Sequence, residues 1–456
     1  MSTDPREIIS QSRMTALQIL IIAITFALNS LDGFDILSIS FASPGIAREW
    51  NIDKAALGIV LSMELIGMGL GSFLMGSLAD KLGRRPVVLI CLATMATGMF
   101  MVTATGSIFA LSFWRVVTGF GIGGLLSAMT ALVAEFSSSR RQHLCVSIMS
   151  IGYPIGGVVM GSVASVLLAN HDWRSVFYLG ASVTAVLIPI FYFVVPESIH
   201  WLTRKQPAGA LEKINKTMKK FGHAAISVLP EVSTEARKKS AGDIFSPRFM
   251  AITMILAAAY FLNIITFYFI LKWVPKIVAD MGFAASSAGG VLVWANVGGA
   301  LGGTALGLLS LKIDLKKLTI GVLAGAAVFV TIFGYTPPDL KVMSLLCAIA
   351  GFFCNAGVIG LYAMVALAYP THARAFGTGF MIGFGRGGSM LSPILAGFLF
   401  EMRMPLPSVA MVMAGGALMG VVVLSFLKLR SNDPSHGSYV EDEQKKSSDP
   451  SVAQVC

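Results

Sequence analysis

Twelve apolar stretches recur along the chain, each about 20 residues or longer and separated by polar segments. An α-helix rises about 1.5 Å per residue, so each stretch can cross the roughly 30 Å hydrocarbon core of a bilayer. They lack the short alternating pattern of transmembrane β-strands. We therefore predict transmembrane helices near residues 14–41, 55–78, 86–105, 107–134, 142–169, 173–195, 249–275, 284–309, 317–335, 340–368, 376–399 and 406–428.

The longest internal polar segment divides these stretches into two sets of six, and the sets resemble each other. Ala134–Arg140 follows the fourth stretch in the way that Ala368–Arg374 follows the tenth. Duplicated six-helix halves are typical of secondary transporters. The predicted fold class is an all-α polytopic membrane protein with two pseudo-symmetric six-helix bundles. Its segments would be an N-terminal segment (1–13), a first bundle (14–195), a central loop (196–248), a second bundle (249–428) and a disordered tail (429–456).

Composition agrees with a membrane protein, since 55% of the residues are hydrophobic and 13% are charged, against about 25% charged in soluble domains. The net charge of +10 comes from Lys and Arg gathered in the polar segments on one side of the predicted helices. That side is expected to be cytoplasmic. We therefore predict an inner-membrane protein with both termini in the cytoplasm, a lipid bilayer as its surroundings, no nucleic-acid partner and a monomeric state.

Two acids interrupt the first apolar stretch, in the run Leu31–Asp35. A charge at bilayer depth costs at least about 2.5 kcal/mol, so Asp32 and Asp35 should face protein or water. Three residues apart on a helix, they would share one face. The competing interpretation is a helix that ends at Ser30 and a surface turn that carries both acids.

Several motifs resemble the major facilitator superfamily over nearly the whole chain. Gly76–Arg85 matches the family's G-x-L-x-D-x-x-G-R-R loop, and Arg115 with the glycines after it resembles the fourth-helix motif. The D-G-x-D of Asp32–Asp35 and the segment Tyr369–Arg386 are similar to the aromatic acid:proton symporter family, which includes 4-hydroxybenzoate and protocatechuate transporters. The resemblance implies twelve helices that transport an aromatic carboxylate with protons.

Four ionisable residues fall at similar predicted depths, about 9–14 Å below the outer surface at about 1.5 Å per residue. They are Asp32, Asp35, Glu64 and Arg115. Arg115 stays protonated, so it would pair with one acid and leave the others able to bind a proton. We predict that the four couple transport to protons. The alternative is structural pairing alone, with Glu64 joining two helices.

Arg386 lies alone about 15–18 Å into the eleventh stretch, where a carboxylate substrate would find a counter-charge. Polar and aromatic residues on nearby predicted helices are candidates to line such a site, although each could instead pack against a helix or face lipid. The predicted substrate-binding residues are Arg386, Asn263, Asn296, Asn355, Tyr268, Trp294 and Tyr362.

The resemblance also implies a cytoplasmic gate that holds the inner ends of the helices together. Its residues would be Gly76, Asp80, Gly83, Arg84, Arg85, Glu135 and Arg374. The alternative is that these charges only set the topology.

We expect a secondary active transporter that imports an aromatic carboxylate with protons by alternating access, and not an enzyme. The sequence contains no G-x-x-x-x-G-K loop for ATP and no CxxC or zinc spacing, so neither a cofactor nor a metal site is predicted, and the proton gradient would supply the energy. Pro196–Leu202 leaves open a proton-coupled sugar or aliphatic-acid symporter. The glycines of the fifth stretch leave open a drug/proton efflux antiporter.

Overall fold

The computed structural model describes residues 4–230, 243–247, 249–369 and 371–427, and the described chain is helical. The first set of long helices is α2 (Ala16–Trp50), α3 (Lys54–Leu82), α4 (Arg84–Thr103), α5 (Ile108–Phe136), α6 (Gln142–Asn170) and α7 (Arg174–Val194). The second set is α10 (Met250–Asp280), α11 (Ala285–Leu309), α12 (Leu315–Gly334), α13 (Leu340–Ala368), α14 (Thr371–Glu401) and α15 (Leu406–Ser425). Short helices are α1 (Pro5–Gln11), α8 (Ile199–Lys205), α9 (Ala210–Lys220) and the 3-10 turn η2 (Asp243–Phe245).

Eleven of the long helices within the described residues are apolar enough to cross a membrane. The remaining one, α14, carries Arg386 and several glycines, which lower its hydropathy, yet it packs among the others. The predicted fold class is therefore confirmed. The predicted segment bounds stay predictions, and residues 1–3, 231–242 and 429–456 lie outside the described part of the chain.

Side-chain caps fix where several of these helices begin. Asp53 accepts a hydrogen bond from the Ala56 backbone N–H at 2.6 Å at the start of α3, and Ser107 accepts one from Ala110 at the start of α5. Such caps satisfy the N–H groups that have no partner in the first turn. Gly83 separates α3 from α4 with a φ of 109°, a conformation that strongly favours glycine.

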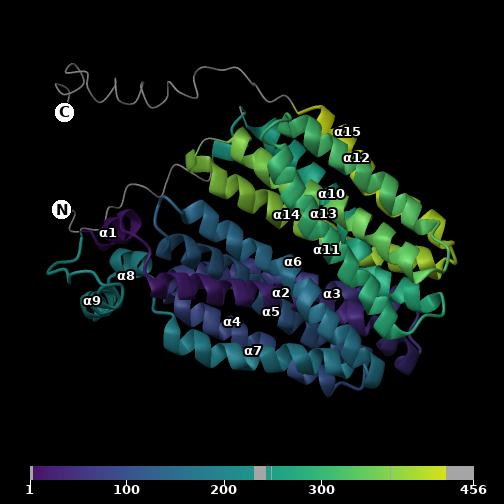
Figure 1. Cartoon of the computed structure of the whole chain (residues 1–456), viewed down its shortest axis with the longest axis horizontal. Helices are drawn as coiled ribbons and strands as arrows, with labels where there is room; N and C mark the ends of the chain where they lie inside the picture. Colours follow the sequence, from purple (N-terminus) through teal and green to yellow (C-terminus); the bar gives the residue numbers. More distant parts are fainter. Residues whose placement is uncertain (1–3, 231–242, 248, 370, 428–456) are drawn as a thin grey trace.

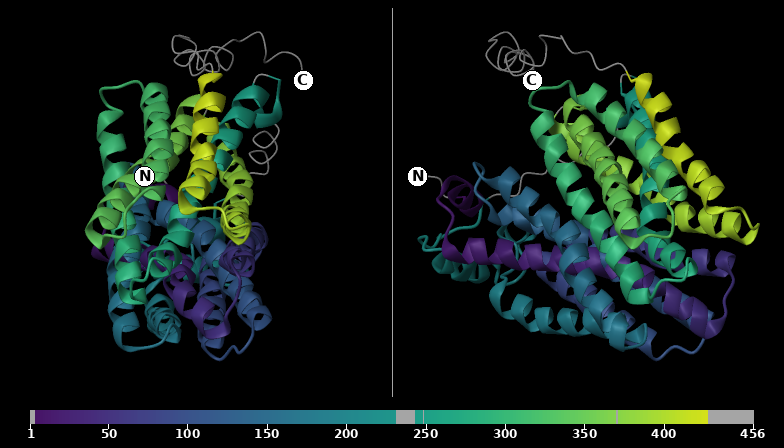
Figure 2. Two further views of the ribbon diagram at one scale, coloured as in Figure 1. Left: turned by 90° about the vertical axis from the view of Figure 1, so that its right-hand side faces the viewer. Right: turned by 45° about the vertical axis from the view of Figure 1, so that its right-hand side comes forward.

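Helices α2–α7 form one half of the molecule and helices α10–α15 form the other, as Figures 1 and 2 show. The halves diverge on the side where α1, α8 and α9 lie, and they converge at the opposite side (Figure 1). Helix α14 packs against α3, α11 against α6, and α10 against α2. The two halves are therefore joined mainly through these three helix pairs, and α11 also contacts α2.

The contact between α3 and α14 is close because it uses glycine. A Cβ added to Gly58 would lie 2.5 Å from the Pro393 carbonyl oxygen, and one added to Gly397 would lie 2.6 Å from that of Lys54. Ser62 Oγ also donates to the Met390 carbonyl at 2.8 Å. Small residues allow such backbone approach between membrane helices. The converged side is therefore tightly closed.

Candidate transport site

The D-G-x-D run lies within a helix, which excludes the surface-turn interpretation. Residues 31–35 are all helical and buried, and α2 continues through Pro44 to Trp50. The helix is longer than the predicted 14–41 stretch because Pro44 is accommodated inside it. Asp32 consequently lies near the middle of the 35-residue helix, farther from the helix end than the predicted end near residue 41 implied.

Glu64 is the centre of a buried ionic cluster that joins both halves. It forms ion pairs with Arg115 from α5 and, at 3.5 Å, with Lys272 from α10, and all three side chains are fully buried. Arg115 Nη2 also donates to the backbone carbonyl of Asp35 at 3.1 Å, and Lys272 Nζ donates to that of Ile36. Buried charges persist when such partners compensate for lost water.

Asp32 and Asp35 are buried without full hydrogen bonding. Both carboxylate oxygens of Asp35 lack a hydrogen-bond partner within the described residues, and so does Oδ1 of Asp32. Asp35 interacts electrostatically with Glu64 and Arg115, and Asp32 interacts with Arg386. The structure therefore brings the four predicted proton-coupling residues together, although their function stays a prediction.

Arg386 on α14 lies among tyrosines that come from both halves. It interacts electrostatically with Tyr260, Tyr268 and Tyr362 of the C-terminal half, and with Tyr153 from α6 of the N-terminal half. The hydroxyls of Tyr260 and Tyr362 are hydrogen-bonded at 2.9 Å, with ring centroids 5.5 Å apart. We call Tyr153, Tyr260, Tyr268 and Tyr362 the tyrosine cluster.

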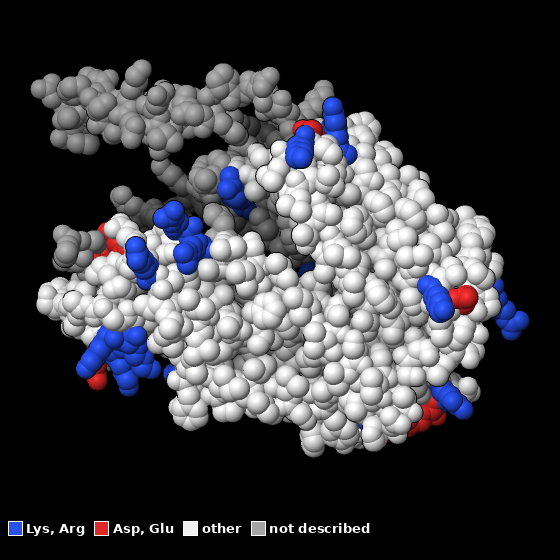
Figure 3. All heavy atoms as spheres, viewed as in Figure 1, with Lys and Arg blue, Asp and Glu red and all other residues white. Residues whose placement is uncertain are grey.

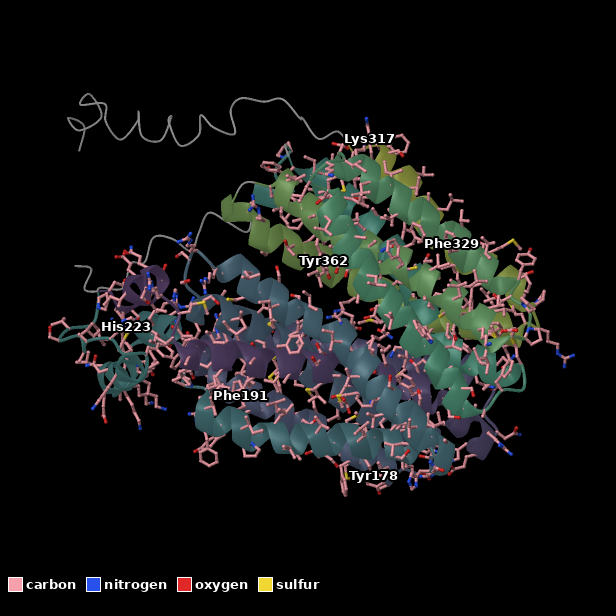
Figure 4. The ribbon with its side chains drawn as sticks, in the orientation of Figure 1. Tyr178, Phe191, His223, Lys317, Phe329 and Tyr362 are labelled. Carbon is pink, nitrogen blue, oxygen red and sulfur yellow. The ribbon has the colours of Figure 1, made fainter. Side chains whose placement is uncertain are left out.

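The tyrosine cluster reaches an open space between the halves. Tyr362 keeps 36% of its surface exposed, and Figure 4 places it between the two sets of helices. Figure 3 shows the surface hollowed in this region, with a basic side chain visible at the bottom. Arg386 itself is partly accessible. A small molecule that enters this hollow can therefore meet a cation and aromatic rings.

The other predicted binding residues do not all belong to this region. Asn263 is fully buried, and neither polar atom of its amide has a partner in the described chain. Asn355 donates to the Gly299 carbonyl at 2.7 Å and holds α13 to α11. Asn296 donates to Leu292 of its own helix at 3.0 Å and would contact a Cβ at Gly157 of α6.

Trp294 was predicted to bind substrate, but the structure places it on an exposed face of α11. It is 52% exposed, and the more exposed Leu301 (61%) and Leu308 (64%) follow it at seven-residue spacing on the same face of α11. Gly299 and Gly303, which face Asn355, lie on nearly the opposite side. The structure therefore places Trp294 on an exposed apolar face, away from the helix contacts of the interior.

The predicted gate residues form a network within the N-terminal half. Asp80 pairs with Arg84 at 3.1 Å and with Arg204 of α8 at 3.0 Å, and Arg84 pairs with Glu135 at 3.6 Å. Arg85 donates to the Tyr192 carbonyl. The described network ties α3, α4 and α5 to α8.

Two predicted gate positions behave differently from that network. Gly76 lies in α3, where an added Cβ would be 3.7 Å from Ser127 Oγ. Arg374 makes no ion pair with a described residue, and its Nε has no hydrogen-bond partner there. In this conformation the network does not link the two halves, which agrees with their divergence on this side.

Glu197, which follows α7, organises the start of α4. Its Oε1 accepts hydrogen bonds from the backbone N–H groups of Arg84 at 2.9 Å, Arg85 at 3.2 Å and Ser198 at 2.8 Å. An acid is favoured at a helix N-terminus. Burial raises the pKa of Glu197, and these three donors oppose that effect. The φ of 109° at Gly83 favours glycine, and an added Cβ would also lie 2.3 Å from Glu197 Oε2.

Sequence reasoning missed Lys272, Tyr153, Glu197 and Arg204 as parts of these sites. A lysine far inside a 31-residue apolar helix was the available signal for Lys272. Glu197 lies in the Pro196–Leu202 motif, which indicated a class of transporter but not the contact with α4. Tyr153 and Arg204 gave no signal, because their partners lie more than 100 positions away in the chain.

Comparison with known proteins agrees with the helical arrangement. The family model described as Major Facilitator Superfamily matches residues 22–339 and 256–452. The chain is 26% identical to the gallate transporter of Pseudomonas putida, over 89% of this chain and 90% of that protein. It is 28% identical to the benzoate transport protein of Acinetobacter baylyi (93% and 92%) and to the 3-(3-hydroxy-phenyl)propionate transporter of Escherichia coli (90% and 94%).

Among solved structures, the partially occluded inward-open xylose transporter XylE of E. coli superimposes with a TM-score of 0.71 at 16% identity, over 92% of this chain and 100% of that one. This similarity concerns the fold alone. The relatives' names confirm the resemblance that the sequence motifs predicted. The chain belongs to the major facilitator superfamily, whose members are membrane transporters and not enzymes.

Proposed function

We propose that this protein imports a small aromatic carboxylate together with protons by alternating access. The observation that carries the proposal is Arg386 with the tyrosine cluster beside an open hollow. Relatives that match most of the chain are named as gallate, benzoate and 4-hydroxybenzoate transporters, which supports the same substrate class. The proton gradient is the energy source, and the protein works as a monomer without a bound cofactor.

Arg386 would bind the substrate carboxylate. A guanidinium offers two parallel N–H donors that match a carboxylate in geometry and charge. The tyrosine rings would pack against the substrate ring, an arrangement worth about 0.5–1.5 kcal/mol for each aromatic pair beyond the buried area. The hydroxyls of Tyr260 and Tyr362 are available to ring hydroxyl groups. Charge and aromatic surface together favour an aromatic acid over a sugar.

Competition for Arg386 supplies a physical route to proton coupling. Asp32 interacts with Arg386 in this structure. A substrate carboxylate that pairs with Arg386 removes this counter-charge from Asp32, and a buried carboxyl without a counter-charge is more stable when it binds a proton. By linkage, a proton on Asp32 strengthens substrate binding to the same extent. Asp35, beside Glu64 and Arg115, would take part in the same proton transfer.

The hollow faces the cytoplasm under this proposal. It lies on the divergent side, near α1, α8 and α9 and the basic segments around Lys81 and Arg84. Basic loops are retained in the cytoplasm. Both termini are therefore assigned to that side, and the conformation is the inward-facing one. Import requires a second conformation in which the contact between α3 and α14 opens.

Uptake of labelled 4-hydroxybenzoate and benzoate into proteoliposomes tests the proposal, with xylose and an aliphatic acid as competitors. We expect accumulation under an inward proton gradient, its loss with a protonophore, and competition by aromatic acids alone. Protein-free liposomes correct for diffusion of the neutral acids. Accumulation that survives the protonophore would refute proton coupling, and competition by xylose would favour the sugar symporter instead.

A further inference from the structure

The ion pair between Glu64 and Lys272 joins the two halves deep inside the protein. Glu64 belongs to α3 of the N-terminal half, and Lys272 belongs to α10 of the C-terminal half. Their charged atoms are 3.5 Å apart and fully buried. Lys272 also donates to the Ile36 carbonyl of α2. One buried cation of the C-terminal half is thus held by two helices of the other half.

We propose that Glu64 and Lys272 form a latch that keeps the halves closed on the side away from α1, α8 and α9. This proposal rests on the proposed alternating access. Within that cycle, Lys272 acts as a positioning residue that holds the two halves together. When that side opens, α10 separates from α2 and α3, so Lys272 must leave both Glu64 and the Ile36 carbonyl. Incoming water then hydrates the released ammonium.

Glu64 is suited to a contact that breaks and reforms. Its pair with Arg115 lies within the N-terminal half and remains when Lys272 departs, so the acid is never left without a counter-charge. Lys272 has no such permanent partner among the ion pairs of the described chain. A buried charge that loses its partner is strongly destabilised. The charges therefore favour two discrete states, closed and fully open, over partly separated ones.

Other polar contacts on this side are weaker candidates for the same task. Lys54 pairs with Asp280 across the halves at 3.4 Å, but both side chains are well exposed, at 42% and 37%. Exposed pairs contribute little because water competes for the charges. Lys276 pairs with Asp280 inside α10 and so cannot hold the halves together. Lys276 provides a matched control, because it lies one turn from Lys272 on the same helix.

A cysteine at Ser62 reports whether the closed side opens. Ser62 is fully buried and donates to Met390 across the contact between α3 and α14. It lies eight residues, or about 12 Å, into α3 from Lys54. The native Cys91, Cys145, Cys347 and Cys354 are buried. In the protein used for labelling, Cys456 is also substituted, as Cys456→Ser, so that it does not react. A membrane-impermeant maleimide is then added outside intact cells, and the rate of labelling is measured at equal levels of inserted protein.

We expect Lys272→Met to raise the labelling rate of the Ser62→Cys protein about tenfold or more, because the population of the outward-open state increases. Lys272→Arg keeps the cation and should stay near the unmodified rate. Lys276→Gln should leave the rate unchanged. Lys272→Gln, which retains a donor for the Ile36 carbonyl, serves as a second variant if Lys272→Met does not insert.

An unchanged labelling rate in an inserted Lys272→Met or Lys272→Gln protein would overturn the latch. Equal acceleration by Lys276→Gln would overturn it too, since the effect would then belong to α10 in general. The readout needs neither substrate nor a proton gradient. A wrong substrate class would therefore leave this result intact, and a failed latch would leave the uptake experiment intact.

Discussion

Replacing Glu64 with Gln tests the energetic importance of the buried cluster. The substitution keeps the shape of the side chain and removes the negative charge that Arg115 and Lys272 share. All three side chains are fully buried, so water cannot replace the lost partner. Removal of one member of a buried pair costs about 3–5 kcal/mol. We expect the free energy of unfolding to fall by at least that amount, because two cations lose their partner.

Thermal unfolding of the purified protein in detergent measures this effect. At about 2 °C for each kcal/mol, the midpoint should fall by about 6–10 °C. The matched control is Lys54→Gln, which breaks the exposed contact between the halves at Asp280 and should cost less than about 1 kcal/mol. If Glu64→Gln shifts the midpoint no more than Lys54→Gln does, the cluster is not the buried ionic centre that we describe.

Three further predictions concern transport. Arg386→Gln should weaken binding of an aromatic carboxylate by about 2 kcal/mol or more, which is a roughly thirtyfold increase in KM. Arg386→Lys retains the charge and should keep part of the affinity. Uptake kinetics over a series of substrate concentrations measure both variants. Asp32→Asn should abolish accumulation but retain exchange of labelled for unlabelled substrate, and loss of exchange as well would contradict a pure coupling function. Gly58→Val should hinder closure against Pro393 and accelerate Ser62→Cys labelling, whereas Gly290→Val, at a site with nothing within 4 Å, should not.

The fold could be predicted because membrane insertion imposes a strong and local constraint on the sequence. Backbone groups in lipid must be satisfied within the segment, so long apolar stretches become helices. The same reasoning placed the acids of Leu31–Asp35 inside the protein. The helix end was harder to predict, because α2 continues beyond the apolar stretch that ends near Phe41 and reaches Trp50.

Partners across the chain were harder to predict, since they depend on how helices face each other. Glu64 and Arg115 could be assigned similar depths, but depth did not reveal that Lys272 reaches the same point from the other half. Trp294 and Tyr362 are both aromatic residues in apolar helices. Tertiary packing alone puts Tyr362 beside Arg386 and leaves Trp294 on an exposed face.

Proton movement that accompanies substrate entry tests the central claim most directly. Proteoliposomes with a pH dye in the lumen and no imposed gradient receive 4-hydroxybenzoate outside, in parallel with the Asp32→Asn protein and protein-free liposomes. The account predicts that the lumen acidifies with the protein beyond the protein-free control, at a rate that follows uptake of labelled substrate. It predicts no such excess with Asp32→Asn. Uptake through the unmodified protein without excess acidification would contradict the account.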